Sequence, residues 1–487
     1  MNYRSFHIIS AMGLCFLPHS LHSQDPYIFS NDRFSGISTV GISPTQSFLN
    51  PNQWDVHLFS ENIFIQNSYG YISKTSILGL TSGEIREANI GENITGENTK
   101  KVWDYYNKDI TGYHFSNEIM GPSASYNFTI AEKDFSVGIF SKLRTQSSII
   151  DVDNYLQFTN QEILEPVLYN LSPFEANFMN WTEIGLNLAT EIPFNSDYQW
   201  IAGINIKYLM AHDAFYLKNN ENAVMRRENE DIVLEDGSLA NQKNLFVSDF
   251  DIEIGYATGY DFENETYNYQ SQGNGFGFDF GFAFVNYAGN DDDYDLKISA
   301  NLLDVGWVNF DGFVHHFLGE NFQYTNNSNL EDIEFESPEQ YAQIISNEIY
   351  GNPAQSLVSN DFKIGLPTSL HFNASKNIGV NQYLNIDVVQ RLPIFENSLK
   401  RSNIINASYI LSQHKFAYGA SVSAYEYKNF QMGAFLRYGP LIIGSENLLP
   451  IFIPHQKLHG ADFYIGLKIY PLSNREIERR SRKPCKC

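Results

Sequence analysis

The sequence of 487 residues has few cysteines, few basic residues and no long apolar run. Its three cysteines are Cys15, Cys485 and Cys487, so the body of the chain cannot hold a disulfide framework. Only 32 Lys and Arg stand against 56 Asp and Glu, and this formal net charge of -24 argues against nucleic acid as a partner. Aromatic residues reach 15%, which argues against a disordered acidic chain.

The first apolar segment is too short to cross a membrane. Arg4 precedes ten mainly apolar residues at 8–17, and Ser23 offers a small residue for cleavage. A membrane-spanning helix needs about 20 apolar residues. We therefore predict that residues 1–23 are a secretory signal peptide. A lipoprotein anchor at Cys15 is the less favoured alternative, because bulky Leu14 precedes the cysteine.

The strongest pattern in the chain is an alternation with a period of two. Between Gly275 and Val285 every even position is Phe, and the odd positions are Gly, Asp or Ala. Such a pattern indicates a β-strand with one apolar face, and strands of about 9–11 residues can cross an outer membrane. We predict an all-β transmembrane antiparallel barrel of about 14 strands, with Phe toward lipid and Gly toward the lumen. A secreted all-β protein is the alternative.

Fourteen segments are predicted as strands, and three polar acidic stretches separate some of them. The strands are expected at 53–65, 121–131, 135–147, 182–191, 199–211, 245–257, 275–287, 293–304, 367–376, 382–392, 403–411, 415–427, 429–438 and 460–470. The stretches 79–118, 212–244 and 307–362 are predicted as long extracellular loops. Within the last of these, Ser337 and Pro338 predict the start of a helix.

Several stretches carry a family resemblance through their order and spacing. They are FLNPNQWDVHLFS (48–60), GPSASYNFTIAEKDFSVGIFSKLRT (121–145), WTEIGLNLAT (181–190), AGINIKYL (202–209), GFGFDFGFAF (275–284), LLDVGWVNF (302–310), LPTSLHFNAS (366–375) and FLRYGPLIIGSENLL (435–449). The chain resembles a family of uncharacterised outer-membrane barrel proteins of Bacteroidota. It is more distantly similar to the FadL-type fatty-acid channels and to the PorV component of type IX secretion.

This resemblance implies an N-terminal luminal segment at 24–52, a barrel at 53–472 and a basic periplasmic tail at 473–487. Asn50, Pro51 and Asn52 look like the Asn-Pro-Ala element of FadL-type proteins, where the segment forms a hatch. Asn52 replaces the usual small Ala at the third position.

Four polar residues are predicted to line the lumen, because they alternate with apolar neighbours: Asn205, Lys207, Asp279 and Lys297. They could line a substrate path, or they could form a structural network that closes the interior. The mixture of charge signs favours the structural network slightly.

The sequence contains no catalytic, phosphate-binding or dinucleotide motif, so we predict no enzyme activity and no cofactor. His315 and His316 could bind metal but are more simply solvated loop residues, and we predict no metal site. The acidic run at 290–293 is better explained as a hairpin turn than as a Ca²⁺ loop.

The predicted function is that of an outer-membrane channel for small hydrophobic or amphipathic solutes. The alternative is a non-enzymatic scaffold or partner subunit of a surface or type IX secretion complex. Outer-membrane lipid is the expected partner in both cases, together with a hydrophobic solute in the first and surface or secretion-complex proteins in the second.

Overall fold

The computed structural model describes residues 25–81, 85–87, 101–105, 110–131, 133–153, 166–192, 198–233, 239–287, 293–325, 336–453 and 457–471. The predicted signal peptide at 1–23 and tail at 473–487 lie outside these residues. No helix within the described ranges is long and apolar enough to cross a membrane.

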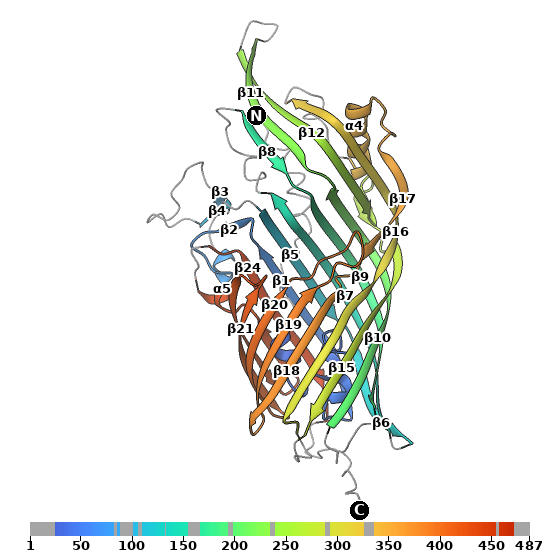
Figure 1. Cartoon of the computed structure of the whole chain (residues 1–487), viewed down its shortest axis with the longest axis vertical. Coiled ribbons are helices and arrows are strands. Elements are labelled where there is room, and N and C mark those ends of the chain that lie inside the picture. Colours follow the sequence, from blue (N-terminus) through green and yellow to red (C-terminus); the bar gives the residue numbers. More distant parts are fainter. Residues whose placement is uncertain are drawn as a thin grey trace, which may run out of the picture.

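The chain folds into a closed antiparallel barrel of 14 strands, which confirms the predicted fold class and strand number (Figure 1). The sheet closes because β24 pairs with β1. The second strand of the barrel consists of β5 and β6, which both pair with β1 and β7. The barrel strands are β1 (Trp54–Asn67), β5 (Ile110–Met120), β6 (Ser123–Ile130), β7 (Lys133–Asp153), β9 (Phe174–Ile192), β10 (Tyr198–Asn219), β15 (Gly273–Asn286), β16 (Leu296–Thr325), β18 (Ser369–Gly379), β19 (Gln382–Arg391), β20 (Ile404–Ser412), β21 (Phe416–Tyr425), β22 (Asn429–Tyr438), β23 (Leu441–Ser445) and β24 (Gly460–Ile469).

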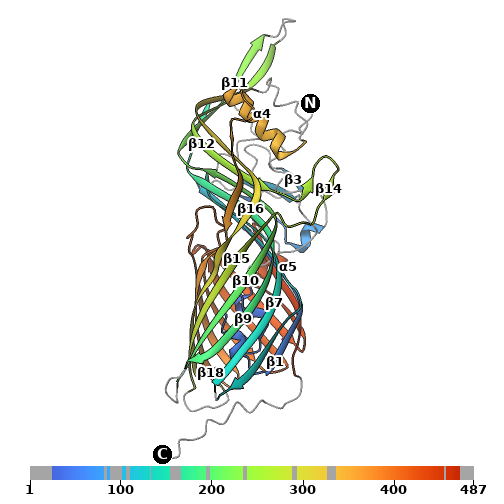
Figure 2. The same cartoon turned by 90° about the vertical axis from the view of Figure 1, so that its right-hand side faces the viewer.

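The two ends of the barrel differ in their connections. At one end, where β24 ends, short turns join the strands; we call it the short-turn end (Figures 1 and 2). At the other end, the long-loop end, the chain makes the longer excursions that contain the remaining strands and helix α4 (Pro338–Tyr350).

The outer face carries a band of exposed apolar side chains, as the alternation predicts. On β15, Phe276, Phe280 and Phe282 are exposed, whereas Asp279 between them is buried in the lumen. On β10 the outward positions run from Tyr198 to Tyr208, ten residues apart. For a strand tilted by about 45° this distance corresponds to roughly 25 Å, the height of the apolar band of an outer-membrane barrel.

One side of the barrel wall is much taller than the other. The strands β7, β9, β10 and β16 have 21, 19, 22 and 30 residues, whereas β19 to β22 have 9 or 10. Four further strands continue the long ones: β8 (Val167–Leu171), β11 (Ala223–Val233), β12 (Leu239–Ala257) and β17 (Leu357–Gly365). We call β7–β12 together with β15–β17 the tall wall, and β19–β24 the short wall (Figure 2).

Two predictions about the tall wall are wrong. The segments 212–244 and 307–362, predicted as loops, contribute much of β10, β11, β12, β16 and β17. The segment 245–257 is not a separate membrane strand. It forms the upper half of the strand whose lower half is β15, since β12 and β15 pair with consecutive parts of both β10 and β16. The predicted segments 245–257 and 275–287 are thus two parts of one barrel strand, whereas β23 was not predicted. These two errors cancel, so the predicted number of strands agrees with the structure.

Helix α4 confirms the predicted helix and explains why the tall wall can leave the membrane. The Ser337 side chain accepts a hydrogen bond from the Gln340 N–H at 3.1 Å, and Gly351 ends the helix in a left-handed conformation. Ala342 packs with Phe250 and Phe317 of the sheet. The helix therefore covers an apolar sheet face that would otherwise meet water.

The remaining elements are short. Helices α2 (Tyr27–Ser30), η1 (Gly36–Thr39) and α3 (Gln46–Leu49) lie in the lumen before β1 (Figure 1). A small sheet of β2 (Gly70–Ile72), β3 (Ile85–Glu87) and β4 (Lys101–Tyr105) accompanies η2 (Leu78–Thr81). Helix α5 (Leu449–Phe452) follows β23, and β13 (Tyr260–Asp261) pairs with β14 (Thr266–Tyr267).

Candidate functional site

The N-terminal segment 25–52 fills the lumen toward the short-turn end and is bound to the wall by buried polar contacts. Arg437 Nε donates to Asp32 Oδ2 at 2.5 Å, and both side chains are fully buried. The Ile28 N–H donates to Glu446 Oε1 at 2.9 Å, and Asn31 Nδ2 donates to Asp387 Oδ2 at 2.7 Å. These contacts reach only short-wall residues, so β19–β24 act as the seat of α2.

Apolar contacts complete this seat. Ile28 and Phe29 form a buried cluster with residues of β20 to β24. We call this cluster the inner apolar cluster; its members are Ile28, Phe29, Ile410, Ala417, Phe435, Ile442 and Tyr464. Each large apolar side chain that is fully buried in this way stabilises the packed state by about 1.5–3 kcal/mol. The segment therefore closes the lumen as a packed element.

The predicted hatch residues lie where the N-terminal segment leaves the lumen and enters β1. Asn50 Nδ2 donates to Asp55 Oδ2 at 3.0 Å, and Asn50 Oδ1 accepts from the Asn52 N–H at 3.1 Å. Asn127 Nδ2 donates to the Asn52 carbonyl at 3.1 Å, and Pro51 lies half-buried between the two asparagines. In this geometry the three residues form the turn that fixes the first strand.

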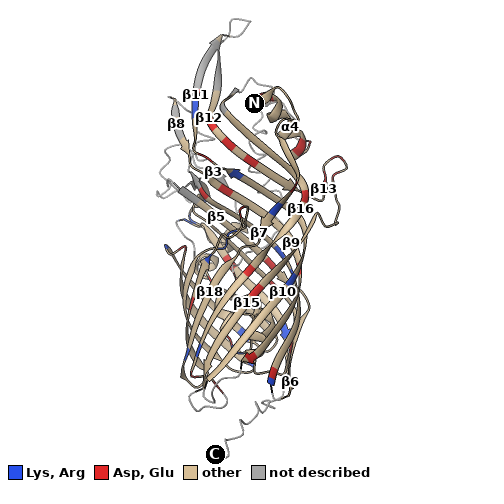
Figure 3. Ribbon diagram, turned by 45° about the vertical axis from the view of Figure 1, so that its right-hand side comes forward, with Lys and Arg blue, Asp and Glu red and all other residues tan. Residues whose placement is uncertain are grey.

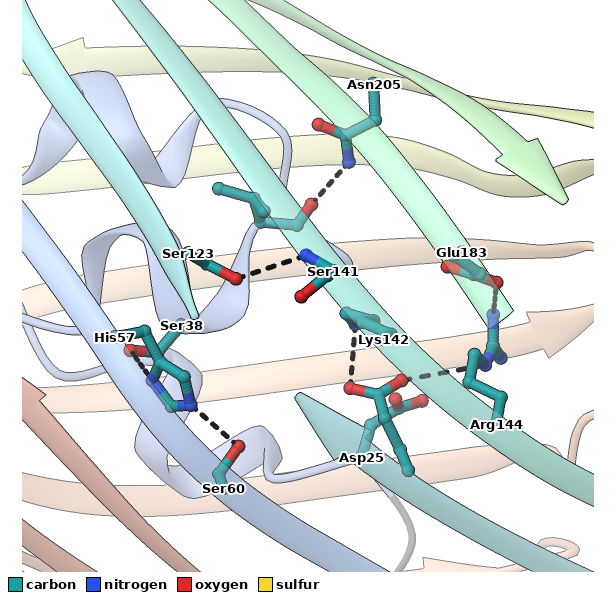
Figure 4. Close-up of polar contacts among 12 residues, drawn as sticks. Asp25, Ser38, His57, Ser60, Ser123, Ser141, Lys142, Arg144, Glu183 and Asn205 are labelled. Carbon is teal, nitrogen blue, oxygen red and sulfur yellow. Dashed lines mark hydrogen bonds and ion pairs between the residues drawn. The ribbon is translucent and has the colours of Figure 1, made fainter. Parts of the chain in front are cut away.

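A layer of buried charges crosses the lumen above the N-terminal segment. Its centre is Asp304, whose carboxylate accepts from Lys207 at 2.5 Å, from Arg144 at 3.0 Å and from Arg401 at 2.7 Å. Arg144 also donates to Glu183 at 2.9 Å (Figure 4). We call Arg144, Glu183, Lys207, Asp279, Asp304 and Arg401 the charged layer. Removing one partner of such a buried group costs about 3–5 kcal/mol.

Three of the four predicted lumen residues belong to this region. Lys207 Nζ donates to Asp279 Oδ1, and Asn205 Nδ2 donates to Asp279 Oδ2, each at 2.8 Å. Asn205 also donates to the Val40 carbonyl of the N-terminal segment at 2.8 Å (Figure 4). Lys297 does not join them. It is buried at the short-turn end of β16, where its Nζ lies 5.9 Å from the centre of the Tyr294 ring.

Arg401 comes from the connection 392–403 between β19 and β20, which folds over the lumen from the long-loop side. We call this connection the mouth loop. Its backbone bonds to the tall wall: the Gly365 N–H donates to the Asn397 carbonyl at 2.7 Å, and the Leu399 N–H donates to the Gly365 carbonyl at 3.0 Å. Leu399 is buried against an apolar patch that includes Trp181 and Phe310. The loop thus spans the opening from the short wall to the tall wall.

The mouth loop and the N-terminal segment meet at one ion pair. Arg401 Nη1 donates to Asp25 Oδ2 at 2.5 Å, while its Nη2 binds Asp304. A cavity of about 10 Å³ lies beside Asp25 and Lys142, and one of about 30 Å³ lies between the segment and β1 and β24. These volumes hold about one and a few water molecules. Passage of a solute would require the loop or the segment to move.

The regular strand pairing of the barrel wall is interrupted at β23, which has only five residues. It pairs with 434–438 of β22 and with 464–467 of β24. Above it, the Leu448 N–H donates to the Met432 carbonyl at 2.8 Å, and the Glu446 N–H donates to Asp462 Oδ1 at 2.5 Å. We call residues 446–453 the wall insert. They replace a strand by bends and helix α5.

The wall insert has apolar side chains on its outer side. Phe452 is 62% exposed and Ile453 is 52% exposed. Ile451 packs with Ile77 and Leu458 outside the upper part of β24. On the inner side, Glu446 holds the backbone of α2, and Ile442 and Tyr464 belong to the inner apolar cluster. The wall insert therefore lies between the inner apolar cluster and the lipid-facing band.

The family to which this chain belongs follows from a family model that matches residues 52–446, which include most of the barrel. The chain belongs to the family of unknown function DUF5723. This confirms the predicted resemblance to a barrel family without an assigned function, whereas the affiliation with Bacteroidota stays a prediction. A comparison with curated protein sequences finds no match.

A comparison with solved structures finds transporters and channels at low sequence identity. The toluene transporter TbuX of Ralstonia pickettii shares 9% identity with a TM-score of 0.30, over 93% of this chain and all of TbuX. A TodX mutant, a monoaromatic hydrocarbon channel, shares 6% with a TM-score of 0.28, over 90% and 94%. A FadL homologue of Pseudomonas aeruginosa shares 8% with a TM-score of 0.21, over 90% and 93%. At these TM-scores the likeness carries no argument about function.

Sequence reasoning missed several residues that organise the lumen of this DUF5723 protein. Arg144 and Glu183 face inward by parity and could have been found, since each lies within a predicted strand. Asp304 lies at a β-bulge of β16 and has a φ of 55°. In the sequence, a single Asp within an apolar run is only a weak indication of such a bulge. Arg401 lies in a connection without period, so no local signal indicates it.

The two histidines of β16 have protein partners. His315 contacts Ser356 Oγ at 2.9 Å and Glu339 Oε2 at 3.1 Å, and His316 contacts Asp251 Oδ1 at 2.7 Å. Neither is a solvated loop residue, because β16 continues far beyond the predicted strand end.

Proposed function

We propose that this DUF5723 protein is an outer-membrane channel for small hydrophobic or amphipathic solutes. The observation that carries the proposal is the wall insert, an apolar non-strand piece of barrel wall between the inner apolar cluster and lipid. The closed barrel and its lipid-facing band support the membrane location.

Two routes through the barrel differ in their energetic cost for an apolar solute. A straight route through the barrel leads past the charged layer and the N-terminal segment, and an apolar solute gains nothing by separating buried ion pairs there. A sideways route past the wall insert exchanges one apolar environment for another. Opening the sideways route breaks fewer hydrogen bonds between strands, because the ladders of β23 with β22 and β24 include only residues 441–445 and not the wall insert.

The mouth loop and the N-terminal segment supply the closure. The apolar patch under Leu399 is available to a solute only when the mouth loop lifts. Lifting withdraws Arg401 from Asp25, and this removes one anchor of the N-terminal segment. Glu446 is a further anchor and is itself part of the wall insert. Among the described residues no observation favours the alternative scaffold role.

The test is uptake by a Gram-negative host whose outer membrane otherwise excludes apolar probes. We expect expression of the protein to raise uptake of the fluorescent probe 1-N-phenylnaphthylamine, and the double substitution Phe452→Gln and Ile453→Gln to abolish the increase. Uptake of a polar chromogenic β-lactam should not change in either case.

The matched control is Val380→Gln, which alters an equally apolar exposed residue at the short-turn end. Heat-modifiable migration in detergent gels checks that every variant forms the barrel. Equal probe uptake with and without the protein would refute the channel.

A further inference from the structure

The inner side of the wall insert carries a buried carboxylate without a basic partner. Glu446 is 5% exposed, and its carboxylate accepts hydrogen bonds from the Ile28 N–H at 2.9 Å and from Asn406 Nδ2 at 3.1 Å. Within the part of the chain that the structure describes, no Lys, Arg or His lies within ion-pair distance of Glu446. A carboxylate taken out of water is costly when no opposite charge compensates it.

A second buried carboxylate lies in the same part of the wall. The Glu446 N–H donates to Asp462 Oδ1 at 2.5 Å, and the Ser445 hydroxyl donates to the Asp462 carbonyl at 2.7 Å. Both contacts join the wall insert to β24 beyond the last residue pair of β23 and β24. Negative charge is therefore concentrated at the start of the wall insert.

The charged layer of the tall wall is built differently. Figure 3 shows Lys and Arg in blue beside Asp and Glu in red near β9 and β10. There Asp304 has three basic partners, and Glu183 pairs with Arg144. The chain thus compensates these buried acids with its own bases. A cation brought by a ligand would compensate Glu446 in the same way.

Two polar groups beside Glu446 are buried and have no hydrogen-bond partner among the described residues: Asn406 Oδ1 and the Tyr464 hydroxyl. Asn406 Oδ1 belongs to the amide group that donates to Glu446. The Tyr464 ring lies over Gly444, two residues before Glu446, where a larger side chain would collide with the hydroxyl. Oxygen atoms that can all accept favour a ligand group with several donors and no acceptor. A primary ammonium group has three donors and no acceptor.

An apolar surface begins at the same place. Tyr464 and Ile28 belong to the inner apolar cluster, and the cavity of about 30 Å³ touches this cluster. A Cβ atom at Gly433 of β22 would lie 2.8 Å from both the Glu446 Cα and the Ile28 Cδ1, so the wall insert and α2 meet at this strand. A ligand whose charge lies at Glu446 therefore has apolar side chains directly beside it.

We propose that the inner side of the wall insert binds a hydrophobic primary amine, with the ammonium group on Glu446 and the apolar part on the inner apolar cluster. The ammonium group takes the place of the Ile28 N–H at Glu446 Oε1, so binding releases one anchor of the N-terminal segment. The inference rests on the proposed channel and names the class of solute that the sideways route accepts.

The test measures binding to the full chain in lipid nanodiscs by equilibrium dialysis at pH 7, with binding to empty nanodiscs subtracted. The probes are radiolabelled octylamine, which is protonated at this pH, and 1-octanol, which has the same alkyl chain without the charge. We expect octylamine to bind about tenfold more tightly, because hydrogen bonds to charged groups are the stronger ones. Equal affinities, or no saturable binding of octylamine, would overturn the proposal.

Two substitutions locate the amine at this site. Glu446→Gln removes the charge but keeps an acceptor for the Ile28 N–H, and octylamine affinity should fall about tenfold. Tyr464→Phe removes only a hydroxyl without a partner, so the barrel should fold, and octylamine affinity should fall about threefold. The matched control is Glu118→Gln, which changes a carboxylate on the same cavity that already has Lys142 as its partner at 2.7 Å. This variant should keep the preference for octylamine over 1-octanol.

Octylamine affinity that is unchanged in Glu446→Gln would overturn the site. Where that variant forms no barrel, unchanged affinity in Tyr464→Phe would do so.

Hydrogen exchange tests the displacement of α2. The Ile28 amide should exchange several times faster with saturating octylamine than with 1-octanol, because its acceptor Glu446 is then occupied. Equal exchange in the two cases would overturn the displacement. Failure of the channel is a separate result, since it appears as absent uptake of 1-N-phenylnaphthylamine, whereas dialysis reports on the amine site alone.

Discussion

The tall wall and the short wall follow the same alternation of apolar and polar residues, yet they meet different surroundings. On the short wall, strands of 9 or 10 residues end near the edge of the apolar band. On the tall wall, the 30 residues of β16 continue beyond it, and α4 replaces lipid as the cover of the outward face. The apolar face of a strand must be covered, but its sequence does not specify whether lipid or a helix covers it.

The inner faces differ as well. The short wall binds the N-terminal segment through several separate pairs, such as Arg437 with Asp32 and Glu446 with the Ile28 backbone. The tall wall carries the charged layer around Asp304. The mouth loop begins on the short wall and docks on the tall wall, so it joins the two systems through Arg401.

The largest effect is expected from Asp304→Ala on the tall wall. Three buried cations, on Lys207, Arg144 and Arg401, lose their shared acceptor, and the barrel should be destabilised by about 3–5 kcal/mol. Urea unfolding in detergent measures this loss. The control is Asp295→Ala, whose ion pair with Lys376 is exposed and should contribute less than about 1 kcal/mol. Similar losses in both variants would contradict the central role of Asp304.

Where the N-terminal segment contacts the short wall, Asp32→Ala should have a smaller effect than Asp304→Ala. Arg437 keeps neutral acceptors, the carbonyls of Gln413 and His414 and the Tyr470 hydroxyl, so we expect a loss of about 2–3 kcal/mol. The loss should be local. Proteolysis within 25–52 is expected to become faster while the unfolding midpoint of the barrel changes little. A barrel that unfolds as a whole in this variant would show that the two walls are not separable.

The contact between the walls is tested by Leu399→Ala. This truncation leaves a cavity in the apolar patch on the tall wall, and docking of the mouth loop should weaken by about 2–3 kcal/mol. Hydrogen exchange of 392–403 measures it. Leu384→Ala, which shortens an exposed outward leucine on β19, is the control and should leave the exchange of the loop unchanged. Protection of the loop that survives Leu399→Ala would mean that its backbone bonds alone hold it.

The smallest effect concerns the cover of the tall wall and depends on pH. Partial burial raises the pKa of Glu339, but hydrogen bonds from Tyr256 and Gln343 and the contact with His315 outweigh it and hold this pKa below its ordinary value of 4.5. A carboxyl with a lowered pKa stabilises the folded state above its unfolded value, and this contribution is lost as the pH falls through the folded pKa.

We therefore expect α4 to exchange its amide hydrogens faster below about pH 4, after correction for the intrinsic pH effect, with a change below about 1 kcal/mol. Glu339→Gln should flatten this dependence. A dependence that persists in Glu339→Gln would assign it to another group.

Much of the fold could be predicted because period-two alternation is a local property. Phe276 to Phe284 alternate in the sequence and lie on the lipid face of β15, as expected. Phe250, Ile252 and Ile254 alternate with polar residues in the same way, and this pattern predicts a membrane strand at 245–257. Only the position of α4 distinguishes these two cases.

Of the candidate site, the sequence predicted Asn205, Lys207 and Asp279 as inward residues, and these three side chains are hydrogen-bonded in the structure. It could not indicate their neighbours Asp304 and Arg401, because Asp304 lies 97 residues beyond Lys207 and Arg401 lies a further 97 residues beyond Asp304. Contacts between side chains so far apart in the sequence depend on the shear and closure of the barrel.

By itself, the sequence of this chain determined the inward or outward direction of most strand residues, because successive side chains of a strand point to opposite faces. The tertiary structure alone decided which charges share a carboxylate, where the mouth loop docks and where β23 yields to the wall insert. These features depend on strand register and on connections without a period. Both are set by the closure of the whole sheet.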